Sequence, residues 1–319
     1  MMRFALAALA FFVVQGSFAQ SYPAKPVTMV VGFAPGGGTD TVSRIIAKTL
    51  GENLGQQVIV DNKAGAGGNI AADHVARAAP DGYTLLLGNV GSLAVAPHLV
   101  ARLSFDPLRD LAPVTMAVVF ANVIVVHPSI PANTLAEFVT LAKAKPDQLT
   151  YGSSGIGGAG HLAGELLKMM ANIDIVHVPY KGGGPAMQGL LGGQISAYFA
   201  TPVAAGPHIR AGKARALATT GATRSKLMPD MPTVAESGYP GYEATNWYAY
   251  VVPAKTPPAI IERLSRELGK VLATPEVVDL LHKQGVEPQP GTPQELGRFI
   301  QREYQTWGKV VKEAKIQAN

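Results

Sequence analysis

The sequence predicts an α/β protein of two similar lobes, each a mostly parallel β-sheet with helices on its faces, joined by two strand crossings. Strand-type runs alternate with glycine-rich turns and with apolar residues at helical spacing, which is typical of such sheets. This order of elements occurs twice, within 25–88 and within 149–202. Extended apolar runs at 111–129 and 246–257 lie where they would carry the chain between the lobes and back.

The N-terminal residues 1–19 are predicted to be a secretory signal peptide that is cleaved after Ala19. Arg3 precedes an apolar stretch from Phe4 to Val14, and small residues stand at the cleavage position. That stretch is shorter than the roughly 20 residues that a transmembrane helix needs. This length disfavours the alternative of a retained anchor helix, so we expect an exported protein.

The composition excludes several classes of function. The chain has no cysteine, which excludes thiolate metal sites, disulfide scaffolds and cysteine nucleophiles. It has 27 Lys and Arg against 22 Asp and Glu, scattered without a block of like charges. Nucleic-acid binding needs a clustered basic footprint, so we expect no nucleic-acid partner. About 300 residues follow the signal peptide, enough for two domains with cores of their own.

The first set of elements belongs to the first lobe. In order, it comprises a strand at 25–33, a helix that ends before Gly55, a strand at 56–62, a glycine-rich turn and helix within 63–82, and a strand at 83–88. The helix before Gly55 is indicated by apolar residues at Val42, Ile45, Ile46 and Leu50.

The second set repeats this order in the second lobe. It comprises a strand, glycine loop and helix within 149–170, a strand, glycine loop and short helix within 173–193, and a strand at 194–202. A capping box, Thr134 to Glu137, predicts a helix start ahead of this set.

The C-terminal helices are expected to complete the first lobe, because two crossings return the chain to it. Pro257 and Pro258 start one of these helices, and a capping box from Thr292 to Glu295 starts another. The predicted division assigns 20–122 with 249–319 to the first lobe and 123–248 to the second. Two such lobes form a hinged clamshell, whose ligand is expected outside the carboxyl ends of the strands.

Two glycine loops in equivalent places of the two lobes are the best candidate for a ligand site. Gly36 to Gly38 and Gly155 to Gly160 each precede a helix, whose first N–H groups and dipole favour an anion. The alternative is that these glycines only permit tight turns and close helix packing. Two loops, one in each lobe, favour a shared anion site over that alternative.

The sequence motifs of these loops give little support to nucleotide binding. No P-loop pattern occurs, whereas "GIGGAG" from Gly155 does match G-x-G-x-x-G between a strand and a helix. That fingerprint also requires an acidic residue at the end of the next strand, and the nearest acid, Asp174, stands at that strand's beginning. A dinucleotide site is therefore a weak alternative, and no cofactor is predicted.

An exported enzyme is the alternative from another class. Ser153 and Ser154 lie in "GSSG", which is not a nucleophile elbow, and the histidines show no metal-ligand spacing, so no metal site is predicted. His161 could donate to an anion or act as a capping or packing residue. Asp40 could complement the helix dipole or receive a ligand's ammonium group.

Neither loop contains an arginine; Arg44 lies one turn deeper in its helix and Lys181 lies in a neighbouring loop. A carboxylate would therefore be held mainly by backbone N–H groups, ordered water and the hydroxyls of Thr39, Ser153 and Ser154.

Long stretches of the chain resemble one known family. "FAPGGGTDTVSRIIAKTL", "YGSSGIGGAGHLAGELL" and "RSKLMPDMPTVAESGYPGYEATNWY" are similar to the Bug proteins, the TctC-type periplasmic solute receptors of tripartite tricarboxylate transporters. The resemblance implies two Rossmann-like lobes in a Venus flytrap arrangement, a periplasmic location, a membrane permease as partner, and no catalysis. It also implies a first pincer loop at Pro35 to Asp40 and a second at Tyr151 to His161, which clasp a carboxylate of the ligand.

The candidate ligand-binding residues combine the two pincer loops with further positions implied by the resemblance. They are Phe33, Pro35, Gly36, Gly37, Gly38, Thr39, Asp40, Asn89, Ser92, Ser153, Ser154, Gly157, Gly158, His161, Tyr180, Gly183 and Thr201.

The sequence departs from the family's pattern at one place. Many relatives carry an acidic residue, able to meet an amino group, where this chain has Ala200 and Thr201. The departure favours a dicarboxylate, tricarboxylate or aromatic acid over an amino acid. We therefore expect a monomeric periplasmic receptor that captures a small carboxylate for a permease, with an exported hydrolase-like enzyme or a sensor partner as the alternatives.

Overall fold

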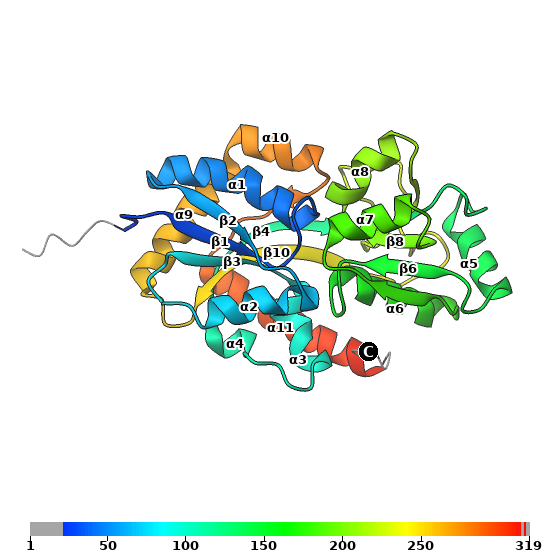
Figure 1. Cartoon of the computed structure of the whole chain (residues 1–319), viewed down its shortest axis with the longest axis horizontal. Helices are drawn as coiled ribbons and strands as arrows, with labels where there is room; N and C mark the ends of the chain where they lie inside the picture. The colour runs from blue at the N-terminus through cyan, green and yellow to red at the C-terminus, as the bar shows by residue number, and fades with distance from the viewer. Residues whose placement is uncertain (1–21, 314–315, 317–319) are drawn as a thin grey trace, which may run out of the picture.

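The computed structural model describes residues 22–313 and Ile316. It forms two α/β lobes side by side, with the first at the left of Figure 1 and the second at the right. The predicted signal peptide lies outside the described residues. Among the described helices, none is long and apolar enough to cross a bilayer.

The first lobe is built on a six-stranded sheet. Its spatial order is β11 (Glu287–Pro288), β4 (Leu111–Ala121), β10 (Thr245–Pro253), β3 (Thr84–Asn89), β1 (Val27–Val31) and β2 (Val58–Asn62). Strand β1 is parallel to both of its neighbours, and its apolar run is nearly all buried because helices cover both faces. Strand β10 runs antiparallel to β3 and β4, so the sheet is mixed rather than uniformly parallel.

Helices cover both faces of this sheet (Figure 1). One face packs against α1 (Gly38–Leu54), α9 (Pro258–Ala273) and α10 (Pro275–Lys283). The other carries η1 (Ala66–Gly68), α2 (Asn69–Ala76), the π-helical turn η2 (Gly91–Val95), α3 (Ala96–Leu99), α4 (Pro107–Asp110) and α11 (Pro293–Glu313). The C-terminal helices thus complete the first lobe, because the chain has returned to it through β10.

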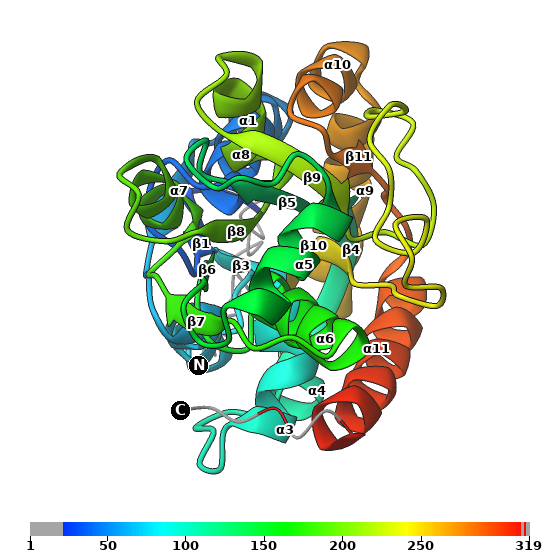
Figure 2. The same cartoon turned by 90° about the vertical axis from the view of Figure 1, so that its right-hand side faces the viewer.

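The second lobe is built on a five-stranded sheet. Its order is β7 (Val176–Pro179), β6 (Thr150–Ser153), β8 (Ala197–Ala200), β5 (Val123–Val126) and β9 (Arg215–Thr219). One face packs against α5 (Leu135–Ala144) and α6 (Ala159–Ala171), and the other against α7 (Gly183–Leu191) and α8 (Pro202–Arg210), as Figure 2 shows end-on. Strand β5 is antiparallel to its neighbours because it enters from the first lobe.

The two crossings between the lobes are joined by hydrogen bonds. The chain leaves the first lobe at Asn122, whose N–H donates to the Thr220 hydroxyl at 2.9 Å. That hydroxyl donates in turn to the carbonyl of Ala244 at 2.8 Å, just before the chain re-enters the first sheet. Strand β10 pairs with β4 from Thr245 onward, four residues earlier than the predicted change of lobe after Tyr248. The strand pairing places those four residues with the first lobe.

Both predicted capping boxes begin helices, with one difference between them. The Thr292 side chain accepts from the N–H of Glu295 at 3.2 Å, and the Glu295 carboxylate accepts from the N–H of Thr292 at 2.8 Å. Thr134 caps α5 in the same way at 3.2 Å, but the carboxylate of Glu137 accepts from Asn133 instead. At α5, therefore, the backbone N–H that donates to the glutamate carboxylate is one residue earlier than in a standard capping box.

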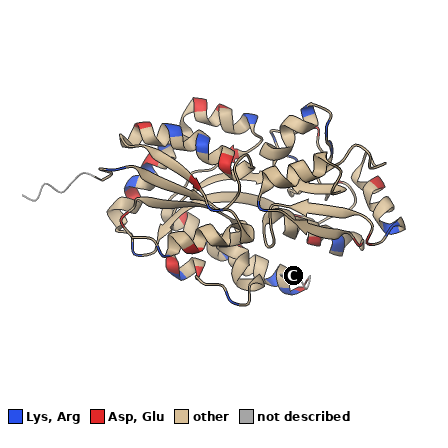
Figure 3. Cartoon of the chain, in the orientation of Figure 1, with Lys and Arg blue, Asp and Glu red and all other residues tan. Residues whose placement is uncertain are grey.

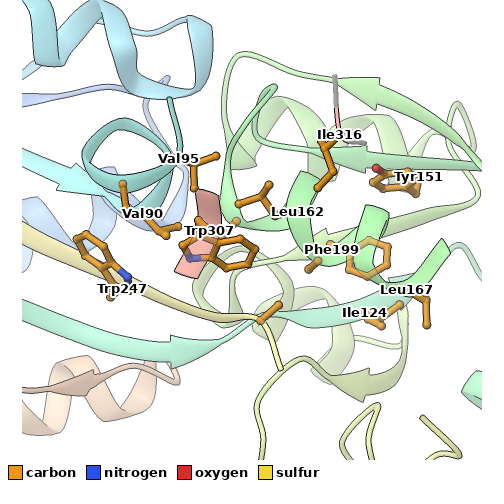
Figure 4. Packing of buried hydrophobic residues seen from close by; sticks show 14 of the residues in the cluster. Val90, Val95, Ile124, Tyr151, Leu162, Leu167, Phe199, Trp247, Trp307 and Ile316 are labelled. Carbon is orange, nitrogen blue, oxygen red and sulfur yellow. The ribbon is translucent and has the colours of Figure 1, made fainter. Parts of the chain in front are cut away.

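The apolar core continues from one lobe into the other (Figure 4). Val95 and Trp307 of the first lobe belong to the same buried cluster as Leu162 and Phe199 of the second. Basic and acidic residues are interspersed along both lobes (Figure 3). The described conformation is accordingly a closed one, with the lobes packed together.

Candidate functional site

The lobes enclose a small cavity where their loops meet. It measures about 20 Å³, which is room for about one water-sized sphere. None of its lining residues carries a formal charge; they are Phe33, Gly37, Gly38, Thr39, Asn89, Ser154, Ala159, Gly183, Thr201, Asn246 and Tyr248.

The first pincer loop is held in shape by a buried carboxylate. Asp40, 4% exposed, accepts from the backbone N–H of Gly36 at 3.0 Å and from the Arg44 guanidinium at 2.9 Å. Asn62, at the end of β2, donates both to Asp40 and to the carbonyl of Phe33. Gly36 adopts φ +81°, a conformation that side chains disfavour. The loop therefore leaves β1 and enters α1 in one fixed path.

The ionisation of Asp40 follows from these bonds. Burial alone would raise its pKa, but the hydrogen bonds from Arg44, Gly36 and Asn62 together outweigh burial, so the pKa is lowered. Asp40 is thus a charged group that is fully engaged within its own loop. The structure places it as a support of the loop rather than as part of the cavity lining.

The second pincer loop is shaped by a serine and a histidine. The Ser153 hydroxyl accepts from the N–H of Gly155 at 3.1 Å, and His161 Nδ1 accepts from the N–H of Gly157 at 3.1 Å. Gly155 and Gly157 have φ of +142° and +74°. The loop then turns into α6, where Ala159 lines the cavity.

Four helices begin at the cavity. Gly38 starts α1 in the first lobe, whereas the second lobe contributes Ala159 of α6, Gly183 of α7 and Thr201, the N-cap of α8. The first N–H groups of a helix have no partner within the helix, and its N-terminus carries a partial positive charge. Helix N-termini from both lobes therefore favour negative charge in a cavity that has no ionised side chain in its lining.

Polar side chains on the first sheet complete the lining. Asn89 ends β3, and its side-chain oxygen accepts from the Ser92 hydroxyl at 2.8 Å, which fixes its orientation. Tyr248 lies on the crossing strand β10, and burial raises its pKa to about 12, so it stays a neutral hydrogen-bond donor. Asn246 lies on the same strand.

Beside the shared apolar core, the lobes touch through backbone at what we call the glycine interface. It consists of Gly37, Gly67 and Gly91 of the first lobe and Gly155, Gly157, Gly158, Gly182, Gly183 and Gly184 of the second. A Cβ on Gly67 would lie 2.4 Å from the carbonyl oxygen of Ile156, and one on Gly91 would lie 2.9 Å from that of Gly157. The N–H of Ala34 donates across the interface to the carbonyl of Lys181 at 3.1 Å. Only glycines allow this approach.

The structure brings part of the predicted set to the cavity. Eight of the seventeen candidate residues line it: Phe33, Gly37, Gly38, Thr39, Asn89, Ser154, Gly183 and Thr201.

The other candidates lie near the cavity without lining it. Asp40, Ser92, Ser153 and His161 support its loops, Pro35, Gly36, Gly157 and Gly158 lie within the pincer loops, and Tyr180 packs on the α7 side of the second sheet.

The candidate residues leave out three lining residues, of which Ala159 lies within the predicted second pincer loop, and they also leave out the supporting Asn62. Ala159, Asn246 and Tyr248 line the cavity, and the last two come from a crossing strand that was expected only to join the lobes. A signal was present in that strand, because polar Asn246 stands directly before its apolar run.

The arrangement suits anion binding better than catalysis. His177 Nε2 lies 2.7 Å from the Ser153 hydroxyl, but neither residue lines the cavity, and the serine is fully buried. Burial, followed by the nearby His161 and Lys168, lowers the pKa of His177 to about 3, which makes it a poor general base at neutral pH.

A two-lobed α/β clamshell with helix N-termini of both lobes aimed at one cavity defines a solute-binding receptor of the periplasmic type. A family model described as the tripartite tricarboxylate transporter family receptor, TctC, matches residues 42–316, and the chain belongs to this family. The family is one of receptors rather than enzymes.

Relatives and solved structures agree with this assignment. The chain is 40% identical to protein BugT of Bordetella pertussis over 296 residues, covering 92% of this chain and 91% of BugT. It is 37% identical to R. palustris Rpa4515, solved with adipate, with a TM-score of 0.90 over 93% of this chain and 99% of that one. It is 34% identical to MatC of Rhodopseudomonas palustris, solved with bound malate, with a TM-score of 0.87 over 91% and 100% of the two chains.

Proposed function

We propose that this receptor captures a small dicarboxylate or other organic acid between its pincer loops and delivers it to a membrane permease. The observation that carries the proposal is the convergence of helix N-termini from both lobes on a cavity whose lining has no charged side chain. Backbone N–H groups and hydroxyls of such a site can pair with a carboxylate. The similar proteins solved with adipate and malate support the same ligand class.

The lining favours acids that lack an ammonium group. It contains no Asp or Glu, and its Thr201 is uncharged. An ammonium group buried there would have no counter-charge, which costs several kcal/mol unless it is paired. The phenyl ring of Phe33 offers an apolar surface for the carbon chain of the ligand.

Binding requires the lobes to part first. The closed cavity of about 20 Å³ is far smaller than the roughly 300–1,000 Å³ of typical small-molecule sites. The ligand thus enters an open form and is enclosed as the crossings at Asn122 and Thr220 bend. A ligand with greater affinity for the closed form shifts the population toward it.

The cellular part of the proposal follows from the family and the N-terminal sequence. We place the mature protein in the periplasm after cleavage of residues 1–19, acting as a monomer beside a permease of the tripartite tricarboxylate type. The receptors of this family are periplasmic binding proteins.

Matched pairs of ligands test the proposal. Calorimetric titration of the purified mature chain would compare malate with aspartate, and adipate with 2-aminoadipate, each pair differing by an ammonium group. We expect one of the acids to bind at least about tenfold more tightly than its amino counterpart, and saturating ligand to raise the melting temperature. Equal affinity within both pairs would contradict the ligand class, and consumption of the ligand would contradict a receptor role.

A further inference from the structure

The second lobe contains another cavity, behind the second pincer loop. It measures about 420 Å³ and is separate from the interlobe cavity. Two histidines, His161 and His177, face it together with charged residues of α6. Their rings stack, with centroids 4.1 Å apart and planes 21° apart.

The hydrogen bond of His161 fixes its protonation. A backbone N–H can only donate, so Nδ1 of His161 must hold a lone pair to accept from Gly157 at 3.1 Å. The ring is therefore neutral with its proton on Nε2. Since His161 is 4% exposed, this bond lies in the interior of the lobe.

The neighbouring ring supports the same loop through a serine. His177 Nε2 lies 2.7 Å from the Ser153 hydroxyl, and this hydroxyl accepts from the N–H of Gly155. The stacked pair therefore holds two backbone N–H groups of the second pincer loop, Gly157 directly and Gly155 through Ser153.

We propose that His161 is a positioning residue of the ligand site, whose neutral ring holds the second pincer loop in shape and whose protonation releases the loop. Protonated Nδ1 would be a donor that faces the Gly157 N–H, another donor, so the bond cannot persist. Gly157 and Gly158 meet Gly91 across the glycine interface, and a displaced loop would disturb lobe closure. The expected effect of His161 protonation on ligand affinity rests on the proposed function. Its expected effect on the conformation of the second pincer loop does not.

The surroundings of His161 set the pH range. Glu165 and Lys168 lie on the same helix as His161, and Glu165 accepts a hydrogen bond from Tyr151 of β6. His177 comes from β7. Asp147 and Asp174 line the same cavity. Burial is the main cause that lowers the pKa of His161, opposed by Glu165 and assisted by Lys168.

The direction of the pH effect follows from this lowered pKa. A released ring titrates near its usual value of about 6.5, so the held conformation loses stability as the pH falls below that value. At pH 5.5 a ring that must stay neutral in the held loop lowers the ratio of held to released loop up to about tenfold.

The first measurement uses the ligand-free mature chain. Amide hydrogen exchange by NMR would give the protection factor of Gly157, corrected for intrinsic exchange, between pH 7.5 and 5.5. We expect it to fall up to about tenfold in the wild type. In His161→Asn, whose Oδ1 can accept at the same place without titrating, it should change little. A pH-independent factor in the wild type would overturn the proposal even if no carboxylate bound.

The second measurement is the dissociation constant of the better ligand, malate or adipate, at both pH values. Titration of the ligand itself affects every variant alike, so the ratio of the two constants is compared between variants. We expect this ratio to be several-fold smaller in His161→Asn than in the wild type, while the exposed control His74→Asn keeps the wild-type ratio. His161→Phe, which lacks an acceptor, should bind weakly at both pH values. Equal ratios in the wild type and His161→Asn would contradict a role of His161 in binding.

Discussion

At the first turn of α1, Asp40 shows how one buried charge organises a loop. Its carboxylate accepts hydrogen bonds from Gly36, Arg44 and Asn62, so each oxygen is occupied. The sequence left open whether Asp40 complements the helix dipole or meets a ligand's ammonium group. The structure places it behind the loop, where a ligand in the cavity would not reach it directly.

Substituting Asp40 by Asn should therefore lower stability. Charge-assisted hydrogen bonds contribute about 1.5–3 kcal/mol each, so we expect the free energy of unfolding to fall by about 1–3 kcal/mol, measured by urea denaturation at pH 7. The lowered pKa of Asp40 means that its stabilisation is present above the unfolded value of about 3.9 and is lost as the pH falls through the folded value. The difference between wild type and variant should accordingly shrink below pH 4. A variant as stable as the wild type at pH 7 would contradict this role.

Residue identities near the cavity were only partly predictable. Glycines and hydroxyl residues next to predicted helix starts identify Gly38, Thr39 and Ser154, because a helix N-terminus has local sequence signals. Tyr248 and Asn246 reach the cavity from a strand more than 150 residues further along the chain than β3. No local signal specifies that register, since it depends on how β10 pairs with β3 and β4.

At the scale of elements, the alternation of strands and helices was predictable, whereas strand direction was not. Apolar runs and glycine turns correctly indicated β1, α1, β2, β3, β6, α6, β7, α7 and β8. Strands β5 and β10 are antiparallel to their neighbours because they are the crossings, a fact of topology that a run of apolar residues does not record. The π-helical turn η2 was not predicted either. It begins at Gly91, a glycine that is explained by contact with the other lobe, and such a contact leaves no local signal in the sequence.

That contact makes Gly91→Ala a test of closure. Gly91 has no positive φ, and within the first lobe the tight neighbour of an added Cβ is the end of the Asn89 side chain, whose Nδ2 would lie 3.2 Å away. In the closed form the Cβ would also lie 2.9 Å from the Gly157 carbonyl oxygen, which is backbone and cannot turn aside. We expect ligand affinity to fall at least about tenfold, because 1.4 kcal/mol of steric cost in the closed form suffices for that. The ligand-free melting temperature should change little.

Gly269→Ala is the matched control for this experiment. Gly269 lies in α9, and a Cβ there would meet nothing within 4 Å. It should stabilise the chain by about 0.5–1 kcal/mol through helix propensity and leave affinity unchanged. If Gly91→Ala bound ligand like the control, the glycine interface would not form in the ligand complex.

At the scale of the whole molecule, the C-terminal part of the chain bridges the lobes. Helix α11 packs on the first lobe. Ile316, beyond its end, lines the cavity that His161 and His177 face in the second lobe, together with Ile156 and Ile175. Ile316 is 7% exposed and belongs to the apolar cluster that spans both lobes (Figure 4). The closed form thus buries a side chain of the first lobe against the second.

Ile316→Ser should weaken closure for this reason. Full burial of an isoleucine contributes about 1.5–3 kcal/mol, so we expect the dissociation constant to rise by about tenfold, with a larger ligand-free radius of gyration by small-angle scattering. The same change at Ile70, which is 52% exposed, should leave both quantities unchanged. Should Ile316→Ser lower the melting temperature without changing affinity, its burial would belong to the first lobe alone.

The closed arrangement of the lobes could not be read from the sequence. Each lobe has its own local pattern, but the apposition of Gly67 with Ile156 and of Gly91 with Gly157 joins segments far apart in the chain. Paired glycine loops indicated that the lobes face one another; only the three-dimensional structure shows which backbone atoms meet.

Since part of the closing surface is glycine backbone, the receptor lends itself to conversion into a fluorescent sensor. Asn246, a side chain that lines the cavity, can be exchanged to alter ligand preference without altering the glycines that meet across the lobes. The chain has no cysteine, so a single one introduced at exposed Ile70, beside η1, would carry one dye at a unique position. When the lobes close and Gly67 meets Ile156, the environment of that dye would change, and its fluorescence would report ligand binding.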